Sequence, residues 1–242
     1  MVKATTSNAA VYGECGRLPP SVSCHVNILT YANRLHYIGN GKVVKQVYNE
    51  LCRLHEMGFA TWVTKVSELV QYYKVDVQTA DSKIFKQQCK MSVKHSFERT
   101  WQQDLVNSTK LRTYTLIKDS FCKEPYLDLI TDIRYRRALT KIRTSSHTLE
   151  IERGRYTRPK TPVHARLCHE CKEIDDEIHF LIHCKLNNTE RTKLFEKVSY
   201  SIPVFATLNS MDKFICLLRS SDAAVLKSLG KFIHRSFLSR NT

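Results

Sequence analysis

Four residues in the last third of the chain have types and spacing suited to holding a metal ion: Cys168, Cys171, His179 and Cys184. Zinc prefers thiolate and imidazole ligands in a tetrahedral shell, and two cysteines separated by two residues supply two of these ligands from one tight turn. Free cysteines are often small buried hydrophobic residues, yet three of the nine cysteines share this 17-residue window. The pattern therefore predicts a Zn²⁺ site.

The fourth ligand has two candidates on sequence grounds. A short helix is predicted to follow Asp175 or Asp176, either of which is a suitable N-cap. On this helix His179 and His183 are four residues apart and share a face, so His183 could replace Cys184. Thiolate is the softer ligand, which favours Cys184. Both versions have four protein ligands and no open position, which is typical of a structural zinc rather than a catalytic one.

Positive charge is the second informative feature. The 242-residue chain has a formal net charge of +15 and a pI near 9.5, a balance typical of proteins that bind polyanions. Ten lysines and arginines lie between residues 134 and 166, against two acidic residues, and this block leads directly into the metal site. A solvated helix face is the alternative explanation, but continuity with the metal site favours phosphate binding. The predicted nucleic-acid-binding residues are Arg134, Arg136, Arg137, Lys141, Arg143, Arg153, Arg155, Tyr156, Arg158, Lys160 and Arg166.

Residues 133–143 within this block have the pattern of an amphipathic helix, whose apolar stripe would pack on a core. Its arginines would then face outward, where guanidinium groups bind phosphates through two hydrogen bonds. After the helix, Tyr156 lies between arginines and could stack on an unpaired base; packing at the edge of the core is the alternative.

The rest of the chain predicts a mainly α-helical fold with a small zinc-knuckle subdomain and minor β segments. Apolar stripes at helical spacing follow residues 43–57, 62–73, 85–105, 214–218 and 226–237, and we interpret them as core-facing. Gly58 is a predicted helix stop, and Ser221 or Asp222 a predicted cap. Residues 147–152 alternate briefly between polar and apolar, which predicts a short strand.

The predicted organisation has four segments: a helical region over 1–110, a basic helix and arginine-rich connector over 111–165, the knuckle over 166–186, and C-terminal helices over 187–242. No apolar run approaches the roughly 18 residues of a membrane span. The six cysteines outside the knuckle lack paired spacing, and the N-terminus lacks a secretory signal pattern, so we expect an intracellular protein, nuclear or cytoplasmic.

Several segments together resemble a known family. They are 111–114 (LRTY), 124–127 (EPYL), 139–147 (LTKIRTSSH) and 149–156 (LEIERGRY), followed by the Cys-Cys-His-Cys pattern. In this order they are similar to the C-terminal tail of non-LTR (LINE-type) retrotransposon reverse transcriptases. Segments 11–17 and 49–51 resemble the helical region after the polymerase core. The resemblance covers roughly residues 10–200 and is most specific from 139 to 184.

The resemblance implies a piece of a larger enzyme without its catalytic part. The family's polymerase site carries a Tyr/Phe-x-Asp-Asp box that holds magnesium ions. Here the one Asp-Asp pair, Asp175–Asp176, lies between the two halves of the metal site and is better explained as a helix cap. No endonuclease motif is identifiable. We therefore expect no enzymatic activity, and a chain that is a detached C-terminal fragment or a short reading frame.

The sequence thus favours a non-catalytic, zinc-dependent module that holds RNA or target DNA, with a reverse transcriptase polymerase core as a further partner. Two alternatives stay open: a zinc-structured interaction domain with an acidic protein partner, and a relic fragment without function. Oligomeric state is not predicted. Because the helices have apolar stripes of their own, loss of zinc is expected to disorder mainly residues 166–185.

Overall fold

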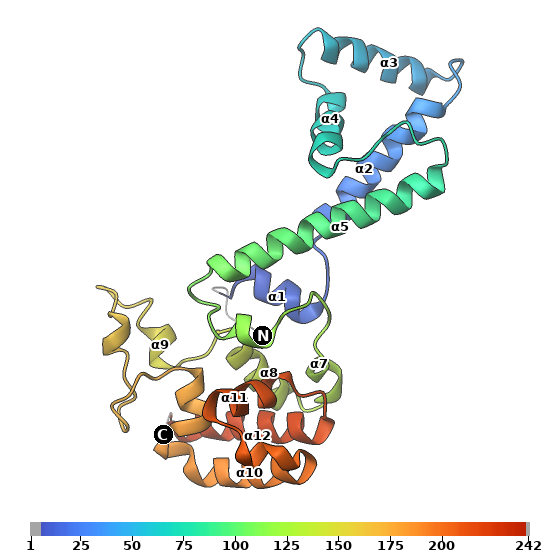
Figure 1. Cartoon of the computed structure of the whole chain (residues 1–242). Coiled ribbons are helices and arrows are strands. Elements are labelled where there is room, and N and C mark those ends of the chain that lie inside the picture. Colours follow the sequence, from blue (N-terminus) through green and yellow to red (C-terminus); the bar gives the residue numbers. More distant parts are fainter. Residues whose placement is uncertain (1–5, 241–242) are drawn as a thin grey trace. The chain divides into compact units, whose positions relative to one another are not determined.

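The computed structural model describes residues 6–240 and divides the chain into two compact units (Figure 1). One unit comprises residues 18–103; the other joins the segment up to Arg17 to everything from Asp104 onward. The predicted mainly α-helical class is confirmed, and the extended pairing within residues 6–240 consists of two isolated β-bridges. The unit boundaries differ from those of the four predicted segments.

The unit of residues 18–103 is built from helices. They are α2 (Pro20–Tyr37), α3 (Val43–Glu56), α4 (Trp62–Tyr73) and most of α5 (Ser82–Asn107). Its core contains Val22, Val26, Leu29, Leu69, Phe85, Cys89 and Val93. The stripe predicted over residues 85–105 is therefore inward-facing, because a spacing of four keeps its members on one helix face.

Polar side chains mark where these helices begin and end. Thr61 caps α4 by accepting the N–H of Val63, and Asp81 caps α5 by accepting the N–H groups of Lys83 and Ile84. Helix α3 ends at Glu56, and the predicted stop, Gly58, adopts φ +89°. A left-handed conformation at this position costs glycine little.

The apolar stripe of α3 is less buried than predicted. Val44 is 38% exposed and Val47 is 54% exposed, while Lys45 is buried between them in sequence. The Lys45 ammonium donates to the carbonyls of Leu35 and His36, at the end of α2. A lysine can satisfy the last carbonyls of a helix in this way. Because Lys45 faces α2 to make these hydrogen bonds, α3 is rotated so that part of its apolar stripe is exposed.

The second unit contains the candidate site and is built from short helices around a few longer ones. Its α-helices are α1 (Asn8–Cys15), α6 (Tyr114–Ile117), α7 (Tyr126–Leu129), α8 (Ile133–Arg143), α9 (Glu150–Arg153), α10 (Asn188–Ser201), α11 (Ser210–Arg219) and α12 (Ala223–Arg240). Its other helical turns are η1 (Val163–Ala165), η2 (His179–His183), η3 (Lys185–Asn187) and η4 (Pro203–Thr207).

Helix α12 packs on both α8 and α10 (Figure 1). Asp222 caps it by accepting the N–H groups of Ala224 and Val225, as predicted for one of two candidates. Gly230 lies where α12 crosses α8, and a Cβ at this position would lie 3.0 Å from the carbonyl oxygen of Tyr135. The missing side chain therefore allows the two backbones to approach closely.

An ionic network in the interior fixes α8 to the segment before residue 18. The guanidinium of Arg143 contacts Glu14 Oε2 at 2.9 Å and Glu124 Oε2 at 2.6 Å, and Arg143 is 1% exposed. Tyr126 donates to Glu14 at 2.6 Å. Because buried charges are stable only when paired, Arg143 has a structural role and its guanidinium is not available to a ligand.

The strand predicted over residues 147–152 is wrong. Residues Glu150–Arg153 form the single turn α9, although the alternate residues Leu149 and Ile151 are buried as a strand pattern requires. The N–H of Glu150 donates to Asp175 Oδ2 and that of Ile151 to the Asp175 carbonyl. These two backbone N–H groups therefore donate to a distant aspartate rather than to a neighbouring strand.

Replacing Arg143 by Ala should lower the free energy of unfolding by about 3–5 kcal/mol, because it leaves the buried Glu14 without a positive partner, whereas Glu124 keeps its ion pair with Lys118. Urea unfolding followed by circular dichroism measures the loss. Arg137→Ala, at an exposed position of the same helix, should change stability by no more than about 0.5 kcal/mol. Equal effects of the two substitutions would contradict the assignment.

Candidate metal centre

The first pair of cysteines lies in a tight turn closed by backbone hydrogen bonds. Leu167 and Ile174 form an antiparallel bridge on either side of the turn. The N–H of Cys168 donates to the Glu173 carbonyl at 2.8 Å, and the N–H of Lys172 donates back to the Cys168 carbonyl at 2.9 Å. Residue Lys172 adopts φ +58°, which turns the chain so that both cysteines face one side.

The second pair comes from a wide helical turn. Asp176 accepts the N–H of His179 at 2.8 Å, so it is the cap, as predicted for one of the two aspartates. Turn η2 is a π-turn, in which the N–H of Cys184 donates to the His179 carbonyl at 2.7 Å. Such turns often occur at functional sites. This one brings His179 and Cys184, which are five residues apart, close together.

These two turns bring the four predicted ligands together. The ligand atoms of Cys168, Cys171, His179 and Cys184 all lie within 4.8 Å of one another, and the sulfurs of Cys168 and Cys184 are 3.9 Å apart. Two thiolates at the usual ~2.3 Å from a tetrahedral zinc lie ~3.8 Å apart. The cluster therefore includes Cys184, whereas His183 is exposed and lies outside it.

The histidine is oriented as a metal ligand requires. Its Nδ1 lies 3.0 Å from Glu173 Oε2, while its Nε2 is buried and has no hydrogen-bond partner. Donation from Nδ1–H to the carboxylate leaves the Nε2 lone pair directed at the cysteines. Metal-binding histidines commonly make this outer hydrogen bond, and a buried lone pair without a partner is otherwise costly.

Two arginines that sequence reasoning missed support the thiolates. Arg240, at the end of α12, donates to Cys184 Sγ at 2.9 Å and to Asp175 Oδ1 at 2.8 Å. Arg191, on α10, donates to the Cys184 carbonyl at 2.8 Å. Arg240 lies 56 residues from Cys184 and Arg191 lies seven residues from it, and no local sequence pattern marks either arginine.

The surroundings shift the protonation of the ligands. Burial on its own raises the pKa of the Cys184 thiol, but His179 and Arg240 lower it to about 6. Contact with the Cys184 and Cys168 sulfurs raises the pKa of His179 to about 9, against the effect of burial. The cluster therefore favours charge separation, with a thiolate beside an imidazolium, when no cation neutralises it.

Glu177, two residues before turn η2, connects the candidate centre to the rest of the unit. Glu177 is fully buried, and its carboxylate contacts Arg112 at 2.5 Å, His147 at 2.9 Å and Ser145 at 2.9 Å. Burial would raise the pKa of Glu177, yet His147 and Arg112 hold it well below its usual value. Ion pairs at Asp175 and Glu177 thus fix the segment between the two pairs of candidate ligands.

The predicted phosphate-binding residues differ in burial and in their side-chain partners. Arg143 and Arg166 are buried, and both must be withdrawn from the set, since Arg143 pairs with carboxylates and Arg166 donates to the carbonyls of Ile151 and Thr161. Arg136 donates to the Leu127 carbonyl, and Arg155 pairs with Glu152.

The other members lie at the surface. Arg134 and Arg153 are exposed but paired with neighbouring acids, and Tyr156 is 56% exposed, beneath the Lys110 ammonium. Within residues 6–240, no hydrogen bond or ion pair engages the cationic groups of Arg137, Lys141, Arg158 or Lys160.

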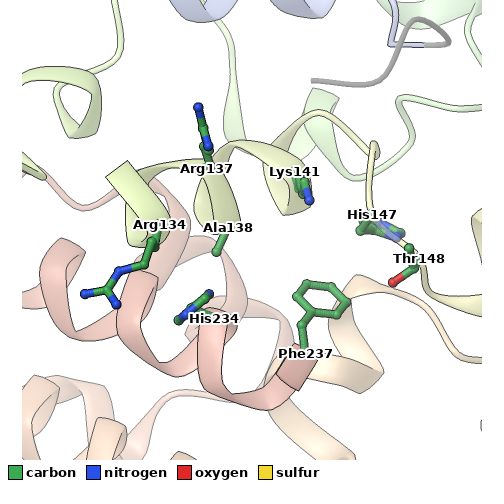
Figure 2. Close-up of a pocket in the computed structure, with 8 residues that line it drawn as sticks. All are labelled: Arg134, Arg137, Ala138, Lys141, His147, Thr148, His234 and Phe237. Carbon is green, nitrogen blue, oxygen red and sulfur yellow. The ribbon is translucent and has the colours of Figure 1, made fainter. Parts of the chain in front are cut away.

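Three surface hollows join this basic region to the metal centre. The first, of about 310 Å³, lies between α8 and α12 and is lined by Arg134, Arg137, Ala138, Lys141, His147, Thr148, His234 and Phe237 (Figure 2). The second shares His147 with it and adds Arg153 and Tyr156. The third shares Thr148 and Phe237 with the first and reaches Asp175 and Arg240, beside the thiolates.

Comparison with known proteins gives no match to any family, curated protein or solved structure. Among residues 6–240, no helix is long and apolar enough to cross a membrane.

Substitution of Cys184 by Ser should remove one ligand and lower bound zinc to well below one ion per chain, since structural sites of this type need four ligands. His183→Ala is the matched control and should retain the metal. Elemental analysis of the purified chains measures both. Full zinc in the Cys184 variant and loss in the His183 variant would reverse the assignment.

Zinc affinity should rise with pH between about 6 and about 9, the values around which Cys184 and His179 titrate. Protons compete with the metal for these groups, so each displaced proton contributes roughly tenfold per pH unit. Competition against a colorimetric chelator at several pH values measures the slope. An affinity independent of pH would exclude thiolate and imidazole as ligands.

Removal of zinc should affect more than the segment 166–185. Phe180 is fully buried and stacks on Phe237 at 4.7 Å, so the π-turn carries part of the packing of α12. A chelator should therefore lower the thermal midpoint of the unit from residue 104 onward. Both tryptophans, Trp62 and Trp101, lie in the other unit, and their fluorescence should report its separate, less affected unfolding.

Proposed function

We propose that the chain is a non-catalytic nucleic-acid-binding module whose fold is completed by zinc. The donor set carries the choice of metal: three thiolates and one imidazole suit tetrahedral zinc, and four protein ligands leave no position for a substrate. Zinc binding to such sites contributes on the order of 10–16 kcal/mol. The metal's part is to hold two turns together, and the binding chemistry belongs to other side chains.

One observation carries the nucleic-acid proposal: the hollows lined by Arg137, Lys141, Arg153 and Tyr156 adjoin one another and reach the metal centre. The three acidic residues along this path are engaged by arginines: Glu150 by Arg153, Glu152 by Arg155 and Asp175 by Arg240. The remaining charge is therefore positive, which attracts a phosphate backbone. An exposed tyrosine beside cations adds a surface on which a base can stack.

The resemblance to the tail of LINE-type reverse transcriptases gives this module a context. On that basis its ligand is RNA or target DNA, and a polymerase core is a second partner. The chain's own residues supply binding and orientation in this proposal, and no step of the chemistry.

The proposal is tested by fluorescence anisotropy with a labelled single-stranded RNA of about 12 nucleotides, within the usual range of site sizes. Affinity should fall with salt at a log-log slope of roughly 0.7 per neutralised phosphate. Arg158→Ala combined with Lys160→Ala should lower both affinity and slope. Lys197→Ala combined with Lys227→Ala changes the net charge equally at exposed positions elsewhere and should have a smaller effect.

Two results would indicate unspecific charge attraction and contradict the proposal. One is an affinity for an acidic peptide equal to the affinity for RNA; the other is an equal loss of RNA affinity from the two pairs of substitutions. Absence of RNA binding at low salt would remove it.

A further inference from the structure

We infer that the hollow in Figure 2 binds one unpaired nucleotide of the nucleic acid, with its phosphate held by Lys141 and Arg137 and its base against Phe237. This inference rests on the proposed function and specifies the form of the ligand. It begins from the size of the hollow, about 310 Å³, which lies at the lower end of the ~300–1,000 Å³ typical of small-ligand sites. Such a space admits one nucleotide and excludes a double helix.

The side chains around the hollow divide into a charged rim and an aromatic wall. Figure 2 shows Arg137 and Lys141 on α8, with His234 and Phe237 on α12 across from them. Ala138 lies between the two sides, and its small side chain leaves the space open. No acidic residue lines the hollow, so nothing in its wall repels a phosphate.

Two of the cations that line this space are not engaged by other parts of the fold. Arg134 is paired with Asp132, but within the described residues 6–240 no hydrogen bond or ion pair engages the cationic side-chain groups of Arg137 and Lys141. They are four residues apart on α8 and therefore lie on one side of it. Two free cations at this spacing can contact the same phosphate, or two successive phosphates, and the exposed Thr148 lies next to them in the wall.

Phe237 is suited to stacking because one side of its ring is already supported. Its ring is nearly parallel to that of Phe180, with an interplanar angle of 21° and centroids 4.7 Å apart. It is only partly buried and lines the hollow. A base entering the hollow would continue the stack that begins at Phe180, and every base offers a face for this contact.

His234 completes the wall and is itself held in place. Its ring lies 5.7 Å from that of Tyr135, the residue whose backbone contacts Gly230 at the crossing of α8 and α12. The close approach of the two helices therefore fixes the width of the hollow. A nucleotide that is paired in a duplex cannot turn its base inward to reach these rings, so the geometry selects unpaired strands.

The test compares anisotropy of labelled oligo(U), oligo(dT) and a duplex of the same length, each of about 12 nucleotides, on the full zinc-loaded chain. Phe237→Leu keeps an apolar contact with Phe180 but removes the flat face, and should weaken single-strand binding about fivefold or more. Phe237→Tyr retains the ring and should restore it. Zinc content of each variant verifies that the unit is folded.

Arg137→Ala combined with Lys141→Ala should reduce the salt slope by roughly 0.7–1.4, for one or two lost phosphate contacts, while Lys197→Ala with Lys227→Ala leaves the slope near that of the unaltered chain. Comparison of oligo(U) with oligo(dT) shows which sugar the site accepts. The duplex should bind more weakly and be insensitive to Phe237→Leu.

Two outcomes overturn the inference and are distinguishable. In the first, the unaltered chain binds RNA, but no better than the Phe237→Leu variant and the combined Arg137→Ala, Lys141→Ala variant. In that case the hollow is not the site, while the proposed function stands. If the unaltered chain binds no nucleic acid, both fall together.

Discussion

Compensation of buried negative charge around the metal centre is the constraint on which the rest of its unit depends. The segment between the two pairs of candidate ligands carries Asp175 and Glu177, both almost fully buried, and the pKa of the Cys184 thiol is lowered to about 6, which adds a thiolate. Uncompensated charges in the interior cost several kcal/mol each. Arg240 pairs with Asp175 and Cys184 from α12, and Arg112 pairs with Glu177, which also lies within hydrogen-bond distance of His147. The ligand loop is thereby fixed to two distant parts of the chain.

This arrangement makes the metal centre part of the core. Phe180, the residue after the ligand His179, packs against Phe232 and Phe237 of α12, and Asn187 donates to its carbonyl. The unit's helices consequently pack against the turns that carry the candidate metal ligands. If a cation occupies the cluster, metal affinity and folding of the unit are linked, because binding displaces protons from the cysteines and the histidine and holds the two turns together.

The sequence reveals the parts of this structure that depend on short-range spacing. The Cys-x2-Cys turn, the Asp176 cap and the four-residue stripe of α5 follow from periodicity and local hydrogen bonding, and all are found. The features it does not reveal involve distant partners. Arg240 lies 65 residues from Asp175, and the N–H groups of α9 are satisfied by that same aspartate, so a strand-like pattern folds as a helical turn.

The same reasoning changes how a basic segment should be interpreted. Arg137 and Arg143 lie six residues apart on α8, yet one is exposed and the other is sealed between Glu14 and Glu124. A count of charges along the sequence gives them equal weight, although only the exposed one is accessible to a ligand. Guanidinium groups suit both tasks because they form paired hydrogen bonds with carboxylates as readily as with phosphates. The acids that α8 meets on its inner side therefore determine which of its cations bind the chain itself and which stay available to a partner.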